Sequence, residues 1–239
     1  MPIHRETLLY DGPGGPFEGM AVVDTDWDMP RPGVMIVPNV LGPKEADFAV
    51  ADRLAATGYA GFVADSYGRG NRATRDDENP RRFMDALDAD RALLRDRLLA
   101  SLGAMKALEE VDARRTAAIG YCFGGKSVLD LARAGGALLG VVSFHGIFDP
   151  PGLDGGPLSA KILVCHGWDD PLAPPDAVTA LAAELSEAGA DWQLLAFGDT
   201  GHSFTDAAQP DYAGGFGYRP DADRRSWRAM RHFLEEIFG

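Results

Sequence analysis

The stretch RTAAIGYCFGGKS, residues 115–127, decides how we interpret the fold. An apolar run typical of a buried strand ends there at Cys122, and a predicted helix begins within two residues of it. Gly120 and Gly124 flank the cysteine in the pattern G-x-C-x-G. Such small neighbours permit a sharp strand-to-helix turn that lifts the central side chain into a site. The alternative is an ordinary buried cysteine, which is common in strands.

Short apolar runs alternate with longer amphipathic segments along the chain. The predicted strands are residues 4–10, 18–24, 33–39, 61–67, 116–122, 140–146, 161–167 and 191–197. The predicted helices are residues 44–58, 79–111, 125–135, 175–189 and 222–238. This alternation predicts an α/β fold, a mostly parallel twisted sheet with helices on both faces. The first two strands follow one another without a helix, so we expect antiparallel additions at one edge.

Glycine and proline mark the helix boundaries: Gly58 and Gly189 where helices should end, Pro80 and Pro175 where they should begin. No Gly/Pro-rich stretch is typical of a domain linker. We therefore predict a single domain over residues 1–239. The loop at residues 149–160 is predicted to be too short for a full cap over a site.

Composition excludes several classes of function. The chain has 239 residues, 46% of them hydrophobic and 25% charged, and its net charge of −13 argues against a nucleic-acid surface. No apolar run approaches the ~18 residues that a membrane span requires, and the N-terminus has no signal-peptide pattern. We expect a cytoplasmic protein with reduced thiols at Cys122 and Cys165 and a small molecule as its partner.

A nucleophile in such a turn needs an acid and then a histidine later in the chain. His202, in GDTGHSFTD, follows a predicted strand in a loop of small and polar residues and is our candidate. His145 and His166 stand at strand ends, where either could line a site or satisfy a backbone group. His4 is expected in a mobile terminus and His232 on a solvated helix surface.

Two candidate acids, Asp169 and Asp170, directly follow the predicted strand 161–167. One carboxylate there can accept the Nδ1–H of His202 and fix the tautomer of the ring. We choose Asp170, because Asp169 could equally serve as a turn or cap residue. Cys122, Asp170 and His202 then fall in the required order, each after a strand, at the edge where α/β sheets form sites. They predict a catalytic triad with a cysteine nucleophile.

The turn itself supplies further chemistry. The N-terminus of the following helix favours a thiolate at Cys122, and the backbone N–H of Phe123 is placed as one donor of an oxyanion hole. Cys165, in the middle of a predicted strand, is interpreted as a core residue.

The segments MIVPNVLG, GYCFGGKS, HGWDDPLAP and GHSF together resemble the dienelactone hydrolase family, the cysteine branch of the α/β-hydrolase fold. The resemblance implies Cys122 as nucleophile, Asp170 as orienting acid, His202 as base and the N–H of Val40 as second oxyanion donor. It implies a carboxylic ester hydrolase of the carboxymethylenebutenolidase type, acting on a small ester or lactone through an acyl-enzyme. No metal or organic cofactor is implied.

Asn39 departs from the family pattern, in which a glutamate at that position helps to generate the thiolate. An amide cannot take up a proton, so we predict that His202 and the helix terminus alone keep Cys122 ionised.

The family binds the substrate carboxylate through two arginines, and Arg69 matches the first. Thr205 and Asp206 stand where the second is expected, and an acid there would repel a carboxylate. Arg69 favours a dienelactone as substrate, whereas Asn39 and Asp206 favour a general carboxylesterase that acts on a neutral ester.

Three aromatic residues are predicted to line an acyl pocket, although each could equally be ordinary core: Tyr67, Phe144 and Phe204. A different class of function also stays open, a non-catalytic binding or redox-sensing protein whose reactive group is the Cys122 thiol. Asp170 and His202 argue against it, because sensing needs only an activated thiol.

Overall fold

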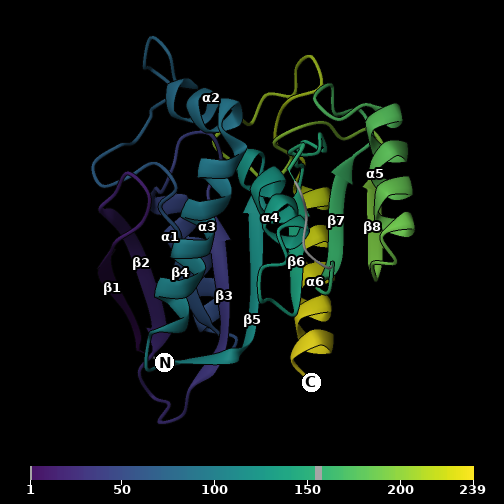
Figure 1. Ribbon diagram of the computed structural model, residues 1–239. Coiled ribbons are helices and arrows are strands. Elements are labelled where there is room, and N and C mark those ends of the chain that lie inside the picture. Colours follow the sequence, from purple (N-terminus) through teal and green to yellow (C-terminus); the bar gives the residue numbers. More distant parts are fainter. Residues whose placement is uncertain (1, 154–157) are drawn as a thin grey trace. The chain divides into compact units, whose positions relative to one another are not determined.

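The computed structural model describes residues 2–153 and 158–239 (Figure 1). Residues 154–157, within the loop predicted to be too short for a cap, lie outside the described residues. The chain divides into two compact units, Met1–Ala118 and Ile119–Gly239. The single domain over residues 1–239 stays a prediction. None of the described helices combines the length and apolar composition that a membrane crossing requires.

The first unit contains four strands in the order β1-β2-β4-β3. They are β1 (Ile3–Tyr10), β2 (Phe17–Asp24), β3 (Arg31–Val37) and β4 (Ala60–Val63). β1 pairs antiparallel with β2, which pairs antiparallel with β4, whereas β3 and β4 are parallel. The predicted antiparallel additions at one edge are therefore confirmed. His4 is paired opposite Val23 within β1, so the prediction of a mobile terminus there is wrong.

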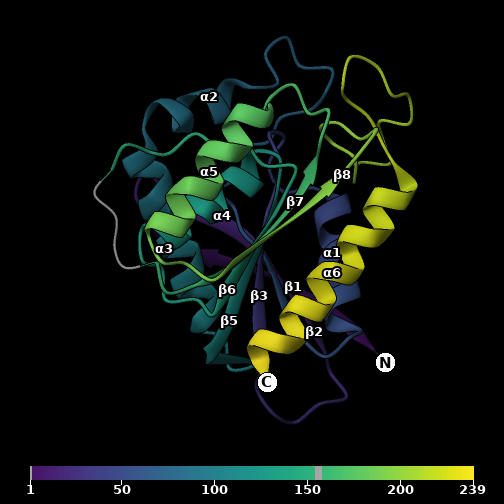
Figure 2. The same cartoon turned by 90° about the vertical axis from the view of Figure 1, so that its right-hand side faces the viewer.

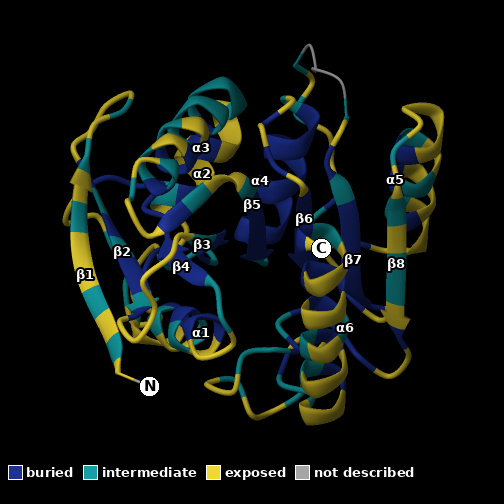
Figure 3. Ribbon diagram, turned by 90° about the horizontal axis from the view of Figure 1, so that it is seen from below, coloured by how far each residue is buried: buried dark blue, intermediate teal, exposed yellow. Residues whose placement is uncertain are grey.

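Helices α1 (Glu45–Ala55) and α3 (Arg91–Lys106) cover opposite faces of these strands (Figure 3). α2 (Arg82–Ala89) precedes α3, so the single helix predicted over residues 79–111 is wrong. The break lies at Asp90, whose backbone is extended (φ −128°, ψ 77°) and whose carboxylate accepts the N–H of Leu93. Asp90 thus caps α3, a role that periodicity does not reveal.

The second unit begins within β5, at Ile119, and the strand order from there is β5-β6-β7-β8. β5 (Val111–Tyr121) leads into it and is followed by β6 (Gly140–Phe144), β7 (Lys161–Gly167) and β8 (Trp192–Phe197). β6, β7 and β8 pair in parallel. α4 (Phe123–Arg133) and α6 (Pro220–Phe238) lie on opposite faces of these strands, with α5 (Pro175–Glu187) on the side of α4 (Figure 2). All five residues of β6 are buried, as expected for a strand covered on both faces.

The predicted helix boundaries hold at several positions. Pro175 is the first residue of α5, and both Gly58 and Gly189 take the positive φ angles (100° and 67°) that end a helix.

A charged cluster is buried where α4 meets α5. The Arg133 guanidinium bonds Asp130 at 3.1 Å and bonds both carboxylate oxygens of Glu184 at 2.6 and 2.7 Å. The side chains of Arg133 and Asp130 are 8% and 2% exposed. Because a buried carboxylate without its cation is strongly disfavoured, this cluster fixes how the two helices pack.

We predict that Arg133→Ala lowers the free energy of unfolding by about 3–5 kcal/mol, because it removes the buried guanidinium that bonds both Asp130 and Glu184. The matched control is Arg231→Ala, which removes an exposed ion pair with Glu235 on α6 and should cost under about 0.5 kcal/mol. Denaturant unfolding measures both, and equal losses would contradict this account of the cluster.

Candidate active site

Cys122 occupies a strained turn between β5 and α4. Its backbone has φ 56° and ψ −115°, and α4 begins at the next residue, Phe123. A non-glycine residue in such a conformation costs about 1–3 kcal/mol and persists only where its surroundings impose it. The turn predicted from the G-x-C-x-G pattern is therefore present.

Position 120 requires glycine because the end of β5 and the start of α4 come very close together at this turn. A Cβ atom there would lie 2.0 Å from the carbonyl oxygen of Gly124 and 2.8 Å from the backbone nitrogen of Gly125. No side chain fits those distances, so the small residues before the cysteine are a direct consequence of the turn.

Hydrogen bonds hold the turn from two directions. The N–H of Cys122 is shared between the carbonyl of Phe144 (3.0 Å) and Nδ1 of His145 (3.2 Å), both at the end of β6. Its carbonyl accepts the N–H of Lys126 (3.1 Å) in the first turn of α4. Cys122 is half-buried, whereas Cys165 is fully buried in β7, where burial raises the pKa of its thiol. The interpretation of Cys165 as core is confirmed.

Asp170 and His202 form a buried pair. Nδ1 of His202 bonds Oδ2 of Asp170 at 2.7 Å, and the two side chains are 3% and 0% exposed. Oδ1 of Asp170 accepts the N–H of Leu172 at 2.8 Å, which fixes the carboxylate in the loop after β7. Asp169, the other candidate acid, is exposed.

Backbone hydrogen bonds from residues 213–217 hold the loop that carries His202. The sequence did not lead us to predict this contact. The N–H of His202 donates to the carbonyl of Gly215 at 2.7 Å, and its carbonyl accepts the N–H of Gly217 at 3.0 Å. A Cβ on Gly201 would lie 1.9 Å from the Gly215 oxygen, so the two backbones touch. The run GGFG at residues 214–217 was the available signal.

Asp170 and Cys122 control the charge of His202. Burial lowers its pKa, but the hydrogen bonds and charges of Asp170 and of the Cys122 side chain outweigh burial and raise the pKa to about 10. Asp170 takes Nδ1, and Nε2 of His202 is buried without a hydrogen-bond partner among the described residues. His202 therefore carries a positive charge at neutral pH.

His145 is buried beside this pair but is neutral. Burial, reinforced by the nearby charge of His202, lowers its pKa well below 6.5, and its ring lies edge-on to that of His202 at 5.1 Å. Its Nδ1 accepts the Cys122 N–H and its Nε2 bonds the hydroxyl of Thr205 at 2.8 Å. Of the two readings that the sequence left for His145, it satisfies a backbone group. Burial also lowers the pKa of His166, in β7.

The predicted site residues before residue 118 belong to the first unit. Oδ1 of Asn39 accepts the N–H of Leu41 at 3.1 Å, so the side-chain oxygen of Asn39 stabilises the turn in which it lies. The hydroxyl of Tyr67, itself buried, donates to the carbonyl of Val40 at 3.0 Å. Arg69 is exposed, and its Nε bonds Glu18 at 3.3 Å.

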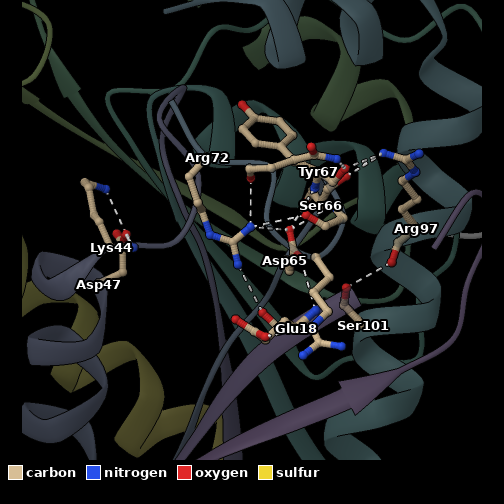
Figure 4. Close-up of polar contacts among 12 residues, drawn as sticks. Glu18, Lys44, Asp47, Asp65, Ser66, Tyr67, Arg72, Arg97 and Ser101 are labelled. Atoms are coloured by element: carbon tan, nitrogen blue, oxygen red, sulfur yellow. Dashed lines mark hydrogen bonds and ion pairs between the residues drawn. The ribbon is translucent and has the colours of Figure 1, made fainter. Parts of the chain in front are cut away.

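Asp65, which sequence reasoning missed, organises the loop that contains Tyr67 and Arg69 (Figure 4). It is fully buried, and one carboxylate oxygen accepts the N–H groups of Tyr67 and Gly68, each at 3.0 Å. Arg72 points at the same oxygen from 3.3 Å. This buried ion pair explains how a loop rich in glycine keeps a fixed shape.

Phe144 and Phe204, predicted to line an acyl pocket, are 1% and 0% exposed. Phe144 stacks on Tyr121 with ring centres 4.8 Å apart, and Phe204 meets His145 edge-on at 5.1 Å. A role in acyl binding stays a prediction for both, and for Tyr67. Among the described residues no three His, Cys, Asp or Glu side chains gather as metal ligands would.

Comparison with known proteins identifies the family. The model of the dienelactone hydrolase family matches residues 17–238, nearly the whole chain. This chain belongs to the dienelactone hydrolase family. The predicted resemblance and the α/β-hydrolase fold are therefore confirmed.

Individual relatives agree with this family assignment. The crystal structure of P91, a dienelactone hydrolase-like promiscuous phosphotriesterase from metagenomic libraries, is 35% identical with a TM-score of 0.92, covering 99% of both chains. A structure named m3DLH is 36% identical with a TM-score of 0.91 over 99% of both. The uncharacterized protein K02A2.1 of Caenorhabditis elegans is 37% identical over 154 residues, 61% of this chain and 94% of its own.

We predict that Cys122→Gly makes the protein more stable than Cys122→Ala by about 1 kcal/mol. Glycine relieves the strain of the turn, and this gain exceeds the entropy it adds to the unfolded chain. The other thiol is the control, because Cys165→Gly in a regular strand should be less stable than Cys165→Ala by about 0.5–1 kcal/mol. Denaturant unfolding of the four variants tests whether the difference in stability between the Gly and Ala variants has opposite signs at positions 122 and 165.

The raised pKa of His202 predicts a specific pH dependence. Since the folded-state pKa lies above the ordinary 6.5, the stability that His202 contributes is complete below pH 6.5 and is lost as the pH rises through about 10. An NMR titration of the imidazole should find its proton retained at pH 8 and released near pH 10. In Asp170→Asn the proton should leave at lower pH. Release near 6.5 in the wild type would contradict the prediction.

Proposed function

We propose that the chain is a cysteine-dependent hydrolase of small carboxylic esters or lactones, with Cys122 as nucleophile. The observation that carries the proposal is the buried Asp170–His202 bond of 2.7 Å, together with Cys122 in the strained turn at the start of α4, whose side chain helps to raise the pKa of His202. An imidazolium held beside a thiol in this way favours the thiolate, which is the reactive form.

The first half of the reaction forms an acyl-enzyme. The thiolate of Cys122 attacks the carbonyl carbon, a C–S bond forms, and the carbonyl electron pair moves onto oxygen. The N–H groups of Phe123 and, as the family implies, Val40 stabilise that oxyanion. When the oxyanion collapses, the C–O bond to the alcohol breaks, and Nε2–H of His202 donates its proton to the departing alkoxide.

The second half of the reaction releases the acid. His202, now neutral, takes a proton from water, and the resulting hydroxide attacks the thioester carbon. The second oxyanion collapses with cleavage of the C–S bond, which restores the thiolate beside the imidazolium. Asp170 stays ionised throughout and keeps the ring in the required tautomer. Because Asn39 cannot accept a proton, this scheme requires none from it.

The charges of the predicted substrate residues favour an uncharged acyl group. Arg69 is already paired with Glu18, His145 is neutral, and the hydroxyl of Thr205 is bonded to His145. Asp206 adds a negative charge in the same loop as Thr205. A carboxylate-bearing dienelactone would therefore find less positive charge than two arginines supply, which favours a general carboxylesterase.

A second candidate activity is the cleavage of neutral phosphotriesters. It is favoured by the 35% identity to the phosphotriesterase P91 over 99% of both chains. A phosphotriester, like a neutral ester, carries no charge for an arginine to bind, and the same thiolate could attack its phosphorus.

Three substrates test the proposal: a short-chain 4-nitrophenyl ester, a dienelactone and a 4-nitrophenyl phosphotriester. We expect the neutral ester to be cleaved fastest, and Cys122→Ala to lower its kcat/KM by at least about a thousandfold. Cys165→Ala is the matched thiol control and should retain wild-type turnover. Faster cleavage of the dienelactone would contradict the preference for a neutral acyl group.

The variant His202→Ala separates catalysis from sensing. A hydrolase should lose ester turnover in this variant, as it does in Cys122→Ala. If the wild type cleaves none of the three substrates and yet Cys122 reacts with iodoacetamide much faster than a free thiol, the thiol-based sensing alternative gains support and the proposed hydrolysis fails.

A further inference from the structure

His145 connects the two parts of the proposed machinery by using both nitrogens of one ring. Nδ1 accepts the backbone N–H of Cys122 at 3.2 Å, and Nε2 bonds Oγ1 of Thr205 at 2.8 Å. Cys122 is the residue of the strained turn, and Thr205 lies three positions after His202. The mechanism above assigns His145 no part in proton transfer.

The hydrogen bonds fix the protonation state of this ring. A nitrogen that accepts an N–H carries no proton, so the single proton of the neutral ring is on Nε2 and is donated to the Thr205 hydroxyl. His145 is 2% exposed, so water does not compete for either bond. Its backbone N–H donates to the carbonyl of Cys165 at 2.9 Å, which ties the residue to β7.

The backbone of His145 is itself constrained, with a φ of 38°. A positive φ in a residue with a bulky side chain indicates that the surroundings hold it there. In the described chain such angles in non-glycine residues occur at Cys122, His145, Asp199 and Ser203. Two of these four are the nucleophile and the histidine bonded to its N–H, and Ser203 adjoins His202.

We propose that His145 is a positioning residue, which sets the sulfur of Cys122 against His202 by tying the nucleophile turn to the base loop through its two ring nitrogens. The proposal rests on the proposed function, because it assigns Cys122 and His202 their catalytic roles. The ring must remain neutral to do this, since a proton on Nδ1 would meet the Cys122 N–H and add a second positive charge beside His202.

Replacing His145 with asparagine or glutamine tests its two ring hydrogen bonds one at a time. In His145→Asn the amide oxygen can replace Nδ1 as acceptor while the bond to Thr205 is lost, and asparagine tolerates the positive φ. In His145→Gln the amide N–H can replace Nε2 as donor while the Nδ1 acceptor is lost, so the Cys122 N–H keeps only the carbonyl of Phe144. The exposed His232 on α6 provides the control His232→Asn, which should change nothing.

We expect each amide variant to lower kcat for the 4-nitrophenyl ester about tenfold with little change in KM, as the loss of one positioning hydrogen bond implies. His145→Gln, which removes one of the two acceptors of the Cys122 N–H, should also slow the alkylation of Cys122 by iodoacetamide. Thr205→Val should resemble His145→Asn, and Thr205→Ser should restore the wild-type rate.

A double-mutant cycle decides between positioning and general destabilisation. If the Nε2–Oγ1 bond carries the effect, His145→Asn combined with Thr205→Val lowers kcat no further than either alone. Multiplied losses, or a wild-type kcat in Thr205→Val, would overturn the proposal.

The alkylation rate keeps the test independent of turnover. If the wild type shows no Cys122-dependent turnover, the proposed function fails, and a slower alkylation of Cys122 in His145→Gln still supports positioning. Unchanged alkylation in that folded variant would overturn it.

Discussion

The backbone of Cys122 is the constraint on which the rest of the site depends. Between β5 and α4 the chain passes at Cys122 through a conformation that non-glycine residues avoid. That turn is possible because Gly120 has no Cβ and leaves room for the backbone of Gly124. It persists because hydrogen bonds from the end of β6 and from α4 hold the cysteine. In the proposed mechanism, the acid and the base have to lie within reach of the side chain that this turn presents.

The second unit buries three histidines, and a bond to a carboxylate decides which of them is charged. Burial disfavours the protonated ring of His145, His166 and His202 alike. Only His202 bonds a carboxylate, that of the fully buried Asp170, and the neighbouring thiol adds to the effect. A protein interior accommodates one such cation when anions pair with it, whereas a second cation on the His145 ring, 5.1 Å away, would raise the cost of both. Neutrality of His145 is thus a condition for the charge of His202.

Sequence reasoning succeeded where local pattern and chemistry coincide. Eight apolar runs became strands, and the spacing of Gly120, Cys122 and Gly124 specified the turn, because a steric demand leaves a sequence signature. It failed at Asp90, where one capping side chain divides a periodic segment into two helices. It also could not connect His145 to Thr205, or Gly201 to Gly215, since contacts between residues far apart leave no periodicity in the chain.

The strain at Cys122 carries an evolutionary consequence. Glycine is the residue that the backbone there prefers, and it is one codon position away from cysteine in the standard genetic code. A lineage under selection for stability alone would be expected to drift toward glycine at this position. A cysteine at this strained position is therefore what the proposed nucleophile role, and not the stability of the turn, would favour.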